Sequence, residues 1–407
     1  MSREDQSRTV KVRAALAGVK VVELGGLIAG PYAASLFAQF GADVIKVEPP
    51  AGGDPLRQWR KLHNGTSVWW YSLGRNKKSV TLNLKSEEGR AIVRDLVKDA
   101  DVLIENFRPG VLEGWGLGWD ELSAINPGLV MVRISGYGQT GPYRDKPGFA
   151  AIAEAVGGLR HLTGEPDRAP VRSGVSLGDS LAGLYAVIGA MAALHHRKVN
   201  GGTGQVVDVA LYEAVFAVME SLIPEYSRFG FVRGRTGGSL PGIAPSNTYP
   251  CAGGSYVVIA GNSDGIFKRL MQAVGRADLA DDPELAGNEG RVRRIDDIDG
   301  AIADWTSQHT LGDVLVALEK ADVPVAKIYT AADIHADDHY RARDMIEHTA
   351  MPDGQPLDIP GIVPKLSATP GATAWVGPTL GEHVEEVLAS LGIRGAALAD
   401  LRERGIV

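Results

Sequence analysis

Short apolar runs alternate with segments of helical period along the first half of the chain. Gly18 to Leu24 and Ala42 to Glu48 have the apolar character of buried strands, and Tyr32 to Phe40 between them has the spacing of a helix. This order predicts a parallel βαβ unit. The same alternation continues through Val80–Leu84, Ser86–Lys98, Asp101–Glu105, Leu112–Ile125, Leu129–Ile134 and Val206–Ala210. The pattern therefore predicts an α/β fold with a doubly wound, Rossmann-like large domain.

Periodicity is lost after residue 225, which indicates a second domain. Arg228 to Pro250 gathers Gly, Arg, Ser and Pro, as in a linker or a functional loop. One further strand, Ser255 to Ala260, then precedes segments of mainly helical period up to Lys320. These features predict a smaller α+β domain. The expected domains are residues 1–225 for the first part of the large domain, 226–329 for the small domain and 330–407 for the return to the large domain.

Composition and charge narrow the possible classes of function. The net charge of −7 over 407 residues argues against a nucleic-acid-binding surface. The single cysteine, Cys251, excludes an internal disulfide and fits a reducing compartment. Met1 to Arg13 has no apolar core, so we expect no signal peptide, and the apolar stretch Leu181 to Leu194 is too short to span a bilayer. We therefore expect a cytoplasmic protein without nucleic-acid or membrane partners.

One carboxylate, Asp179, stands in a turn of Gly and Ser residues before the long apolar stretch Leu184 to Leu194. This sequence predicts a helix whose N-terminus favours the ionised form of the carboxylate. Asp179 or Ser180 could simply be the helix N-cap. An ionised and positioned carboxylate is also what a carboxylate nucleophile requires. The residues alone leave both interpretations open.

Polar and glycine-rich clusters follow or precede several predicted strands. Three polar clusters occupy Lys46–Arg57, Arg75–Ser79 and Glu105–Gly110, and the ends of strands are where doubly wound sheets bind ligands. Their basic residues and the Asn-Phe-Arg turn suit a phosphorylated ligand with an aromatic ring, although each cluster alone could be solvated surface. Four glycines are candidates for approach to a ligand, as oxyanion donors or as parts of a lid: Gly136, Gly138, Gly237 and Gly238.

Three familiar motifs fail on their spacing or context. The glycines from Gly114 to Gly118 lack the strand–turn–helix setting of a dinucleotide loop. His335 and His339 have i, i+4 spacing without a further ligand, so we expect no metal site. The serines near Asp179 form no G-x-S-x-G elbow. Spacing alone thus predicts an α/β enzyme or binding protein with an anionic ligand and an exposed carboxylate.

Six stretches combine these features in a fixed order along the chain: VKVVELGGLIAGPYAASLFAQFGADVIKVEPP, GGDPLR, RNKKSVTLNLK, ENFRPGVLEGWGLGWDEL, ISGYGQTGP and GVSLGDSLAGLYA. Together they resemble the class III CoA-transferases, which include formyl-CoA transferase and carnitine CoA-transferase. The likeness runs from about Gly18 to Gly392. RNKKS, GYGQTGP and VRSGV are most similar to the branch that uses succinyl-CoA and dicarboxylic acids.

The resemblance implies that Asp179 is the catalytic nucleophile, whose carboxylate attacks an acyl-CoA thioester to give an acyl–aspartyl anhydride. It also implies that Lys77, Asn106 and Phe107 line the CoA site, with Arg57 near the same pocket. CoA thioesters are then substrates, and no cofactor is bound permanently. The family forms interlocked dimers, so a homodimer is expected.

A dicarboxylic acid also needs a cation for its distal carboxylate, and the planar fork of arginine suits that role. The candidates are Arg57, Arg60, Arg75, Arg108 and Arg172. The chain departs from formyl-CoA transferase at Gly26, Ile28, Pro49 and Ala150, which makes a small substrate such as oxalate a poorer fit.

Two alternatives remain. An acyl-CoA racemase of the same fold needs a histidine where this chain has Phe149, which cannot transfer a proton. A non-catalytic CoA-binding protein would bind CoA without turnover.

Overall fold

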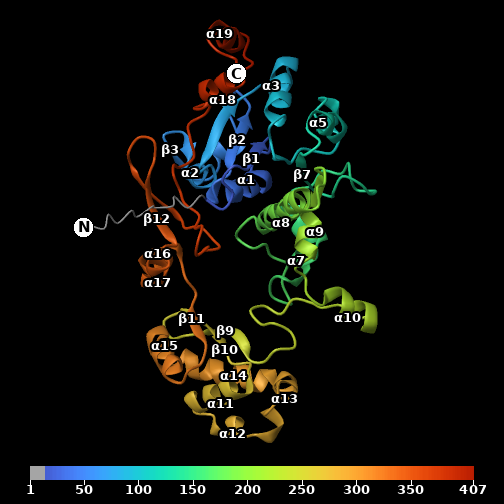
Figure 1. Ribbon diagram of the computed structural model, residues 1–407. Coiled ribbons are helices and arrows are strands. Elements are labelled where there is room, and N and C mark those ends of the chain that lie inside the picture. The colour runs from blue at the N-terminus through green and yellow to red at the C-terminus, as the bar shows by residue number, and fades with distance from the viewer. Residues whose placement is uncertain (1–13) are drawn as a thin grey trace, which may run out of the picture. The chain divides into compact units, whose positions relative to one another are not determined.

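The computed structural model describes residues 14–407, which form two compact units (Figure 1). The large unit comprises the chain up to Leu159, Ser173–Ser221 and Arg341–Val407, and the small unit comprises Arg160–Arg172 and Leu222–Tyr340. The small unit therefore extends beyond the expected 226–329 at both ends. It also includes Arg160–Arg172, which the sequence pattern places in the large domain, because no change in composition marks that segment.

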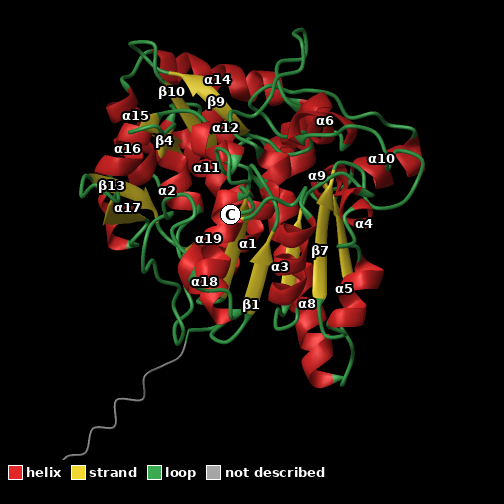
Figure 2. Ribbon diagram, turned by 90° about the horizontal axis from the view of Figure 1, so that it is seen from above, coloured by secondary structure: helices red, strands yellow, loops and turns green. Residues whose placement is uncertain are grey.

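A six-stranded sheet forms the centre of the large unit, with strand order β5-β2-β1-β6-β7-β8. Its strands are β1 (Lys20–Glu23), β2 (Asp43–Glu48), β5 (Lys77–Thr81), β6 (Val102–Glu105), β7 (Val130–Ser135) and β8 (Val206–Ala210). Every neighbouring pair is parallel, and the arrows of β1 and β7 point the same way in Figure 2. The strand order reverses between β1 and β6, which makes this the topological switch point of the sheet.

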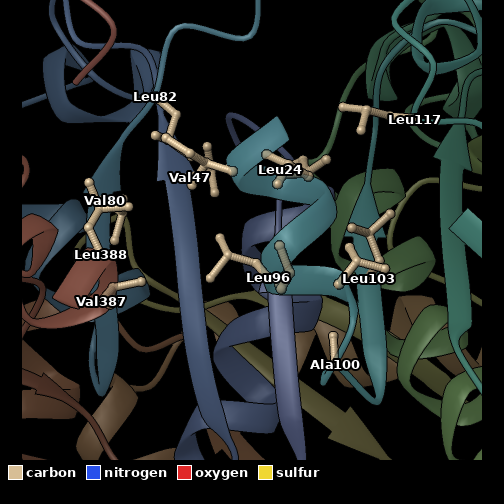
Figure 3. Packing of buried hydrophobic residues seen from close by; sticks show 14 of the residues in the cluster. Leu24, Val47, Val80, Leu82, Leu96, Ala100, Leu103, Leu117, Val387 and Leu388 are labelled. Carbon is tan, nitrogen blue, oxygen red and sulfur yellow. The ribbon is translucent and has the colours of Figure 1, made fainter. Parts of the chain in front are cut away.

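Helices cover both faces of this sheet, as the apolar strand residues require. The helices of the large unit are α1 (Ala29–Gln39), α2 (Val68–Leu73), α3 (Glu87–Val97), α4 (Val111–Gly114), α5 (Trp119–Ile125), α6 (Ala150–Val156), α8 (Leu177–Val199), α9 (Leu211–Phe216), α18 (Val384–Ser390) and α19 (Ala396–Glu403), with the 3-10 turn η1 (Pro55–Gln58). Helices α3, α18 and α19 bury their apolar side chains on one face, where Leu96 and Leu388 pack near Val80 (Figure 3). Helices α1, α8 and α9 cover the other face.

Local sequence explains where these elements begin. Ser86 caps α3, because its hydroxyl accepts the Gly89 N–H at 3.0 Å.

Two short hairpins also belong to the large unit: β3 (Leu62–His63) with β4 (Thr66–Ser67), and β12 (Ile346–Ala350) with β13 (Pro356–Pro360).

The small unit is an α+β arrangement around a three-stranded antiparallel sheet with strand order β11-β10-β9. Its strands are β9 (Ser246–Pro250), β10 (Tyr256–Ala260) and β11 (Val325–Lys327). Val257 and Ile259 of β10 point into a core formed with helices on one side of the sheet. The helices are α10 (Leu222–Phe229), α11 (Asp264–Ala273), α12 (Ala277–Ala280), α13 (Asn288–Arg293), α14 (Ile295–Ser307), α15 (Leu311–Lys320) and α16 (Ala331–Ala336), with η2 (Pro283–Leu285), while α7 (Leu159–Leu162) and α17 (Asp338–Ala342) lie where the chain passes between the units.

Helix α8 (Leu177–Val199) is longer than the apolar stretch Leu181 to Leu194. Within residues 14–407 it is the one helix whose length and composition would suffice to cross a membrane, and a third of its most apolar window is buried. Alanines at 182, 186, 190 and 193 form a stripe that packs into the core of the large unit. Core helices pass the same length test, so this feature is weak evidence for a membrane span. The signal-peptide expectation for Met1 to Arg13 lies outside the described residues.

Candidate active site

A side-chain amide joins two loops at the topological switch point of the sheet. Asn106, directly after β6, accepts the Gly26 N–H on its Oδ1 at 2.8 Å and donates from Nδ2 to the Gly26 carbonyl at 2.9 Å. The approach is so close that a Cβ on Gly25 would lie 3.0 Å from Asn106 Oδ1. The loop after β1 and the turn after β6 are thus fixed to each other at the carboxyl edge of the sheet, where this fold binds ligands.

Asp179 is placed at the same edge by the packing of two helices. Helix α1 follows β1, and α8 precedes the parallel strand β8, so both helices begin at the carboxyl edge of the sheet. They pack closely at Gly183, where a Cβ would lie 2.7 Å from Tyr32 Cδ1 and 3.2 Å from the Ala29 carbonyl oxygen. Asp179 precedes Gly183 by one helical turn and therefore shares its face. The carboxylate is partly exposed.

Helix α8 starts in a way that excludes the N-cap interpretation. Its N-cap is Ser176, so Asp179 occupies the third helical position and Ser180 the fourth. The Ser180 hydroxyl donates to the Ser176 carbonyl at 3.1 Å. Asp179 nevertheless lies within the first turn, where unpaired N–H groups and the helix dipole stabilise negative charge.

The glycine-rich loop after β7 packs against the start of α6, and α6 packs against the start of α8. A Cβ on Gly136 would lie 2.9 Å from the Gly148 Cα, and a Cβ on Gly178 would lie 3.4 Å from the Ala150 Cα. The N–H of Gly138 donates to Ser135 Oγ at 3.0 Å, so this peptide group holds the loop. An oxyanion role for Gly136 and Gly138 stays a prediction.

A buried ionic network lies behind the Gly25–Leu27 loop. Lys46 Nζ is 2.8 Å from both Glu23 Oε1 and Asp54 Oδ2, and it donates to the Gly25 carbonyl at 2.7 Å. Asp54 Oδ1 accepts the Leu27 N–H at 2.9 Å. Burial lowers the pKa of Lys46, but the surrounding carboxylates outweigh burial and raise it. Burial likewise raises the pKa of Asp54, but Lys46 and hydrogen bonds lower it overall. The network therefore carries charge while it fixes the loop.

Two predicted CoA contacts are part of this buried region. Lys77 Nζ is 2.8 Å from Glu23 Oε2 and donates to the Pro31 carbonyl at 2.7 Å, in the first turn of α1. Arg57 forms a bidentate pair with Glu48, at 2.7 and 2.8 Å, and its guanidinium stacks 3.8 Å from the Trp70 ring centre. Both cationic groups are held by carboxylates within the protein, which supports a positioning role. Direct contact of these two residues with CoA stays a prediction.

The remaining candidate arginines lie in different places. Arg108 is exposed and directly follows Asn106 and Phe107 in the turn after β6. Arg60 is also exposed, 5.3 Å from the Trp69 ring centre. Arg75 is buried and donates to the carbonyls of Ser72 and Pro360. Arg172 belongs to the small unit.

The second glycine loop is anchored within the small unit. The Gly237 N–H donates to the Gly164 carbonyl at 3.1 Å, and a Cβ on Gly237 would lie 2.8 Å from Glu165 Oε2. Arg235 donates to the carbonyls of His161, Glu165 and Pro166. A lid function for Gly237 and Gly238 stays a prediction.

Within residues 14–407 no three His, Cys, Asp or Glu side chains are arranged to hold a metal ion.

Sequence reasoning missed the ionic network, although it carried a signal. Lys46 and Glu48 alternate with apolar residues inside a strand that is otherwise buried, and Glu23 ends another such strand. Charged residues are rarely buried unless they are paired, so their presence in core strands indicates mutual neutralisation.

The comparisons with known proteins agree with this fold. The model of CoA-transferase family III matches residues 16–384, and the chain belongs to this family. It is therefore an enzyme of the CoA-transferase class.

The chain is 50% identical over 391 residues to succinyl-CoA–D-citramalate CoA-transferase of Chloroflexus aurantiacus, covering 96% of this chain and 97% of that protein. It is 44% identical to the beta subunit of succinyl-CoA–L-malate CoA-transferase from the same organism, covering 96% and 98%. The crystal structure of a CAIB/BAIF family protein from Brucella suis superposes with a TM-score of 0.82 at 36% identity, covering 93% of this chain and 100% of that one.

Proposed function

We propose that this enzyme transfers CoA from succinyl-CoA to a dicarboxylic acid, with Asp179 as the nucleophile. The observation that carries the proposal is the placement of a partly exposed carboxylate in the first turn of α8, at the carboxyl edge of the sheet. The names of the two relatives support the substrate class, since both pair succinyl-CoA with a dicarboxylic acid.

The reaction proceeds through four exchanges at one carboxylate. An oxygen of Asp179 attacks the thioester carbonyl carbon of succinyl-CoA, the carbon–sulfur bond breaks, and CoA leaves as the thiolate. The thiolate attacks the aspartyl carbonyl of the resulting anhydride, which releases succinate and leaves an aspartyl-CoA thioester. The acceptor carboxylate then displaces the thiolate to form a second anhydride. Attack of the thiolate on the acceptor carbonyl finally gives the acceptor-CoA thioester and restores Asp179.

Each intermediate retains the activation of the first thioester, so the reaction needs protection from water more than it needs a driving force. The first turn of α8 supplies unpaired N–H groups that stabilise negative charge near Asp179, an effect of about 0.3–1 kcal/mol.

For the distal carboxylate of the acceptor we propose Arg108. Arg57, Lys77 and Arg75 are held within the protein, whereas the Arg108 side chain is exposed beside the turn of Asn106 and Phe107. An exposed guanidinium can form a bidentate pair with a carboxylate.

We also propose that a second copy of the chain covers an apolar face of the large unit. Phe149, Ile152 and Val156 form one exposed stripe along α6, with Phe149 70% exposed. Leu184 and Ile188 expose a second stripe on α8, which contacts α6. Exposed apolar surface of this kind is typical of protein interfaces. We propose that the protein forms a homodimer through this face and that it is cytoplasmic. Light scattering of Ile188→Glu, compared with the unaltered protein, would test the homodimer.

The function is tested by incubating the enzyme with succinyl-CoA and a panel of glutarate, malate, citramalate, mesaconate and itaconate, with CoA esters read by mass spectrometry. We expect transfer to at least one acid, and none in Asp179→Asn. Ser180→Ala is the matched control, because it alters the adjacent helical residue and should keep activity. Solvent deuterium at the α-carbon of 2-methylacyl-CoA, without any acceptor acid, would instead favour a racemase. CoA binding without turnover of any pair would favour the non-catalytic alternative.

A further inference from the structure

A buried glutamate lies directly beneath the turn at Asn106 and Phe107. Glu105 is the last residue of β6 and is 1% exposed. Its Oε2 accepts the backbone N–H of Phe107 at 2.7 Å, and its Oε1 accepts Nε of Arg133 at 2.8 Å. Arg133 lies opposite Glu105 in the register of β6 and β7. A single carboxylate therefore connects the sheet to the backbone of the turn.

The far end of the turn is held by the same arginine. Arg133 donates from Nη1 and Nη2 to the two carboxylate oxygens of Glu113 in α4, at 2.5 and 3.2 Å. The ring of Phe107 meets Trp115 edge-on, with ring centres 5.3 Å apart. These contacts and the two hydrogen bonds between Asn106 and Gly26 together hold the turn in place.

We propose that Glu105 is a positioning residue for CoA binding, which sets the geometry of the Asn106–Phe107 turn without touching the ligand. The proposal rests on the proposed function and on the CoA contacts of Asn106 and Phe107 that the family resemblance implies. Glutamate presents two acceptor oxygens, one for Arg133 and one for the Phe107 N–H, whereas glutamine has a single acceptor oxygen.

The test is Glu105→Gln, assayed with succinyl-CoA and titrated with CoA in a calorimeter. One of the two donors loses its acceptor, so we expect the KM for succinyl-CoA and the Kd for CoA each to rise about tenfold, the effect of one charge-assisted hydrogen bond. The kcat should change less than about twofold, because Asp179 and its helix are untouched. A purely structural role for Glu105 would lower the active fraction, and therefore the apparent kcat, without raising KM.

Glu113→Gln is the matched control. It weakens the other ion pair of Arg133 but leaves the bond between Glu105 and Phe107 intact, so KM should stay within about twofold of the unaltered value. An equal rise of KM in both variants would overturn the proposal, because the effect would then belong to the pairing of Arg133.

Should Glu105→Gln fail to fold, the double variant Glu105→Leu with Arg133→Met replaces the buried pair by apolar groups, a change that proteins often tolerate. It still removes the acceptor of the Phe107 N–H, so the same rise in Kd for CoA is expected. Unchanged CoA affinity in the double variant, or in a folded Glu105→Gln, would overturn this proposal alone. Absence of CoA affinity in the unaltered enzyme would overturn the proposed function and this proposal with it.

Discussion

Two carboxylates at the carboxyl edge of the sheet, Glu23 and Asp54, differ from a third, Asp179, in what surrounds them. Glu23 and Asp54 are buried, and each is 2.8 Å from the Lys46 ammonium group. Asp179 is partly exposed in the first turn of a helix, and glycines at 178 and 183 allow the neighbouring helices to approach closely. A buried carboxylate that is paired with lysine can hold a loop but is unavailable as a nucleophile, whereas a partly exposed one at a helix start can react. The comparison separates the residues that hold the loop from the residue that we propose as the nucleophile.

The largest effect is expected at the reactive carboxylate. Asp179→Ala removes the atom that accepts the acyl group, so we expect CoA transfer to fall by about a thousandfold or more. The variant should unfold at nearly the same denaturant concentration as the unaltered protein, because Asp179 is only partly buried in the first turn of α8. Initial rates and urea denaturation check both parts. Full activity of Asp179→Ala would reject the mechanism.

The buried network should show the opposite pattern. Lys46→Met leaves Asp54 without its cation, while Glu23 keeps Lys77. Breaking a buried pair in this way costs about 3–5 kcal/mol of the free energy of unfolding. Lys78→Met is the control, because Lys78 pairs with Asp43 and Glu386 at the surface and its loss should cost less than about 1 kcal/mol. Equal losses of the free energy of unfolding in the two variants, measured by urea denaturation, would contradict the distinction between buried and surface ion pairs.

The free energy of unfolding should depend on pH through the buried carboxyl group of Glu105. Burial raises the pKa of Glu105 from 4.5 to about 7, against the opposing effect of Arg133. The folded protein thus binds this proton more tightly than the unfolded chain does. The resulting stabilisation is complete below about pH 4.5 and is lost as the pH rises through about 7.

Glu105→Gln removes this titration. The loss of stability between pH 5 and pH 8 should therefore shrink, by up to about 3 kcal/mol. Urea denaturation of both proteins at the two pH values measures the difference. The same loss in both proteins would show that Glu105 does not titrate in this range.

The smallest effect concerns the contact between α1 and α8. Gly183→Ala would place a Cβ against the Tyr32 ring and the Ala29 carbonyl, so the helices must separate, at a cost of about 2 kcal/mol. The kcat should fall as well, because Asp179 lies one turn away. Gly300→Ala in α14 is the control, because a Cβ there meets nothing within 4 Å and should be neutral or stabilising. Similar melting temperatures for the two variants would contradict the close packing.

The hydrophobic pattern predicts most of the central sheet but places one strand wrongly. The strands β1, β2, β6, β7 and β8 agree with the apolar runs to within two residues. The third strand was expected at Val80–Leu84 and lies at Lys77–Thr81. The reason is that Lys77 and Ser79 are buried against Glu23 and Glu48, partners that are remote in sequence, so polar residues occupy core positions that an apolar pattern cannot identify.

The motif singles out Asp179 as a candidate, but only the structure assigns it to the third position of α8, where it is not the cap. Asn106 was expected to contact CoA, and its two bonds to Gly26 depend on the reversal of strand order at β1 and β6, which no local pattern encodes. Arg160–Arg172 was assigned to the wrong unit for the same reason, since its contacts are with residues such as Arg235 and Gly237 much later in the chain.

The central claim is that Asp179 exchanges its own oxygen atoms during turnover. The direct measurement uses an acceptor acid labelled with heavy oxygen in its carboxylates, followed by mass spectrometry of the tryptic peptide Ser173–Arg197. Passage through the aspartyl anhydride predicts heavy oxygen in the Asp179 carboxylate after turnover. Heavy oxygen in the released succinate with an unlabelled Asp179 would mean that the acceptor attacks succinyl-CoA directly, and would contradict the account.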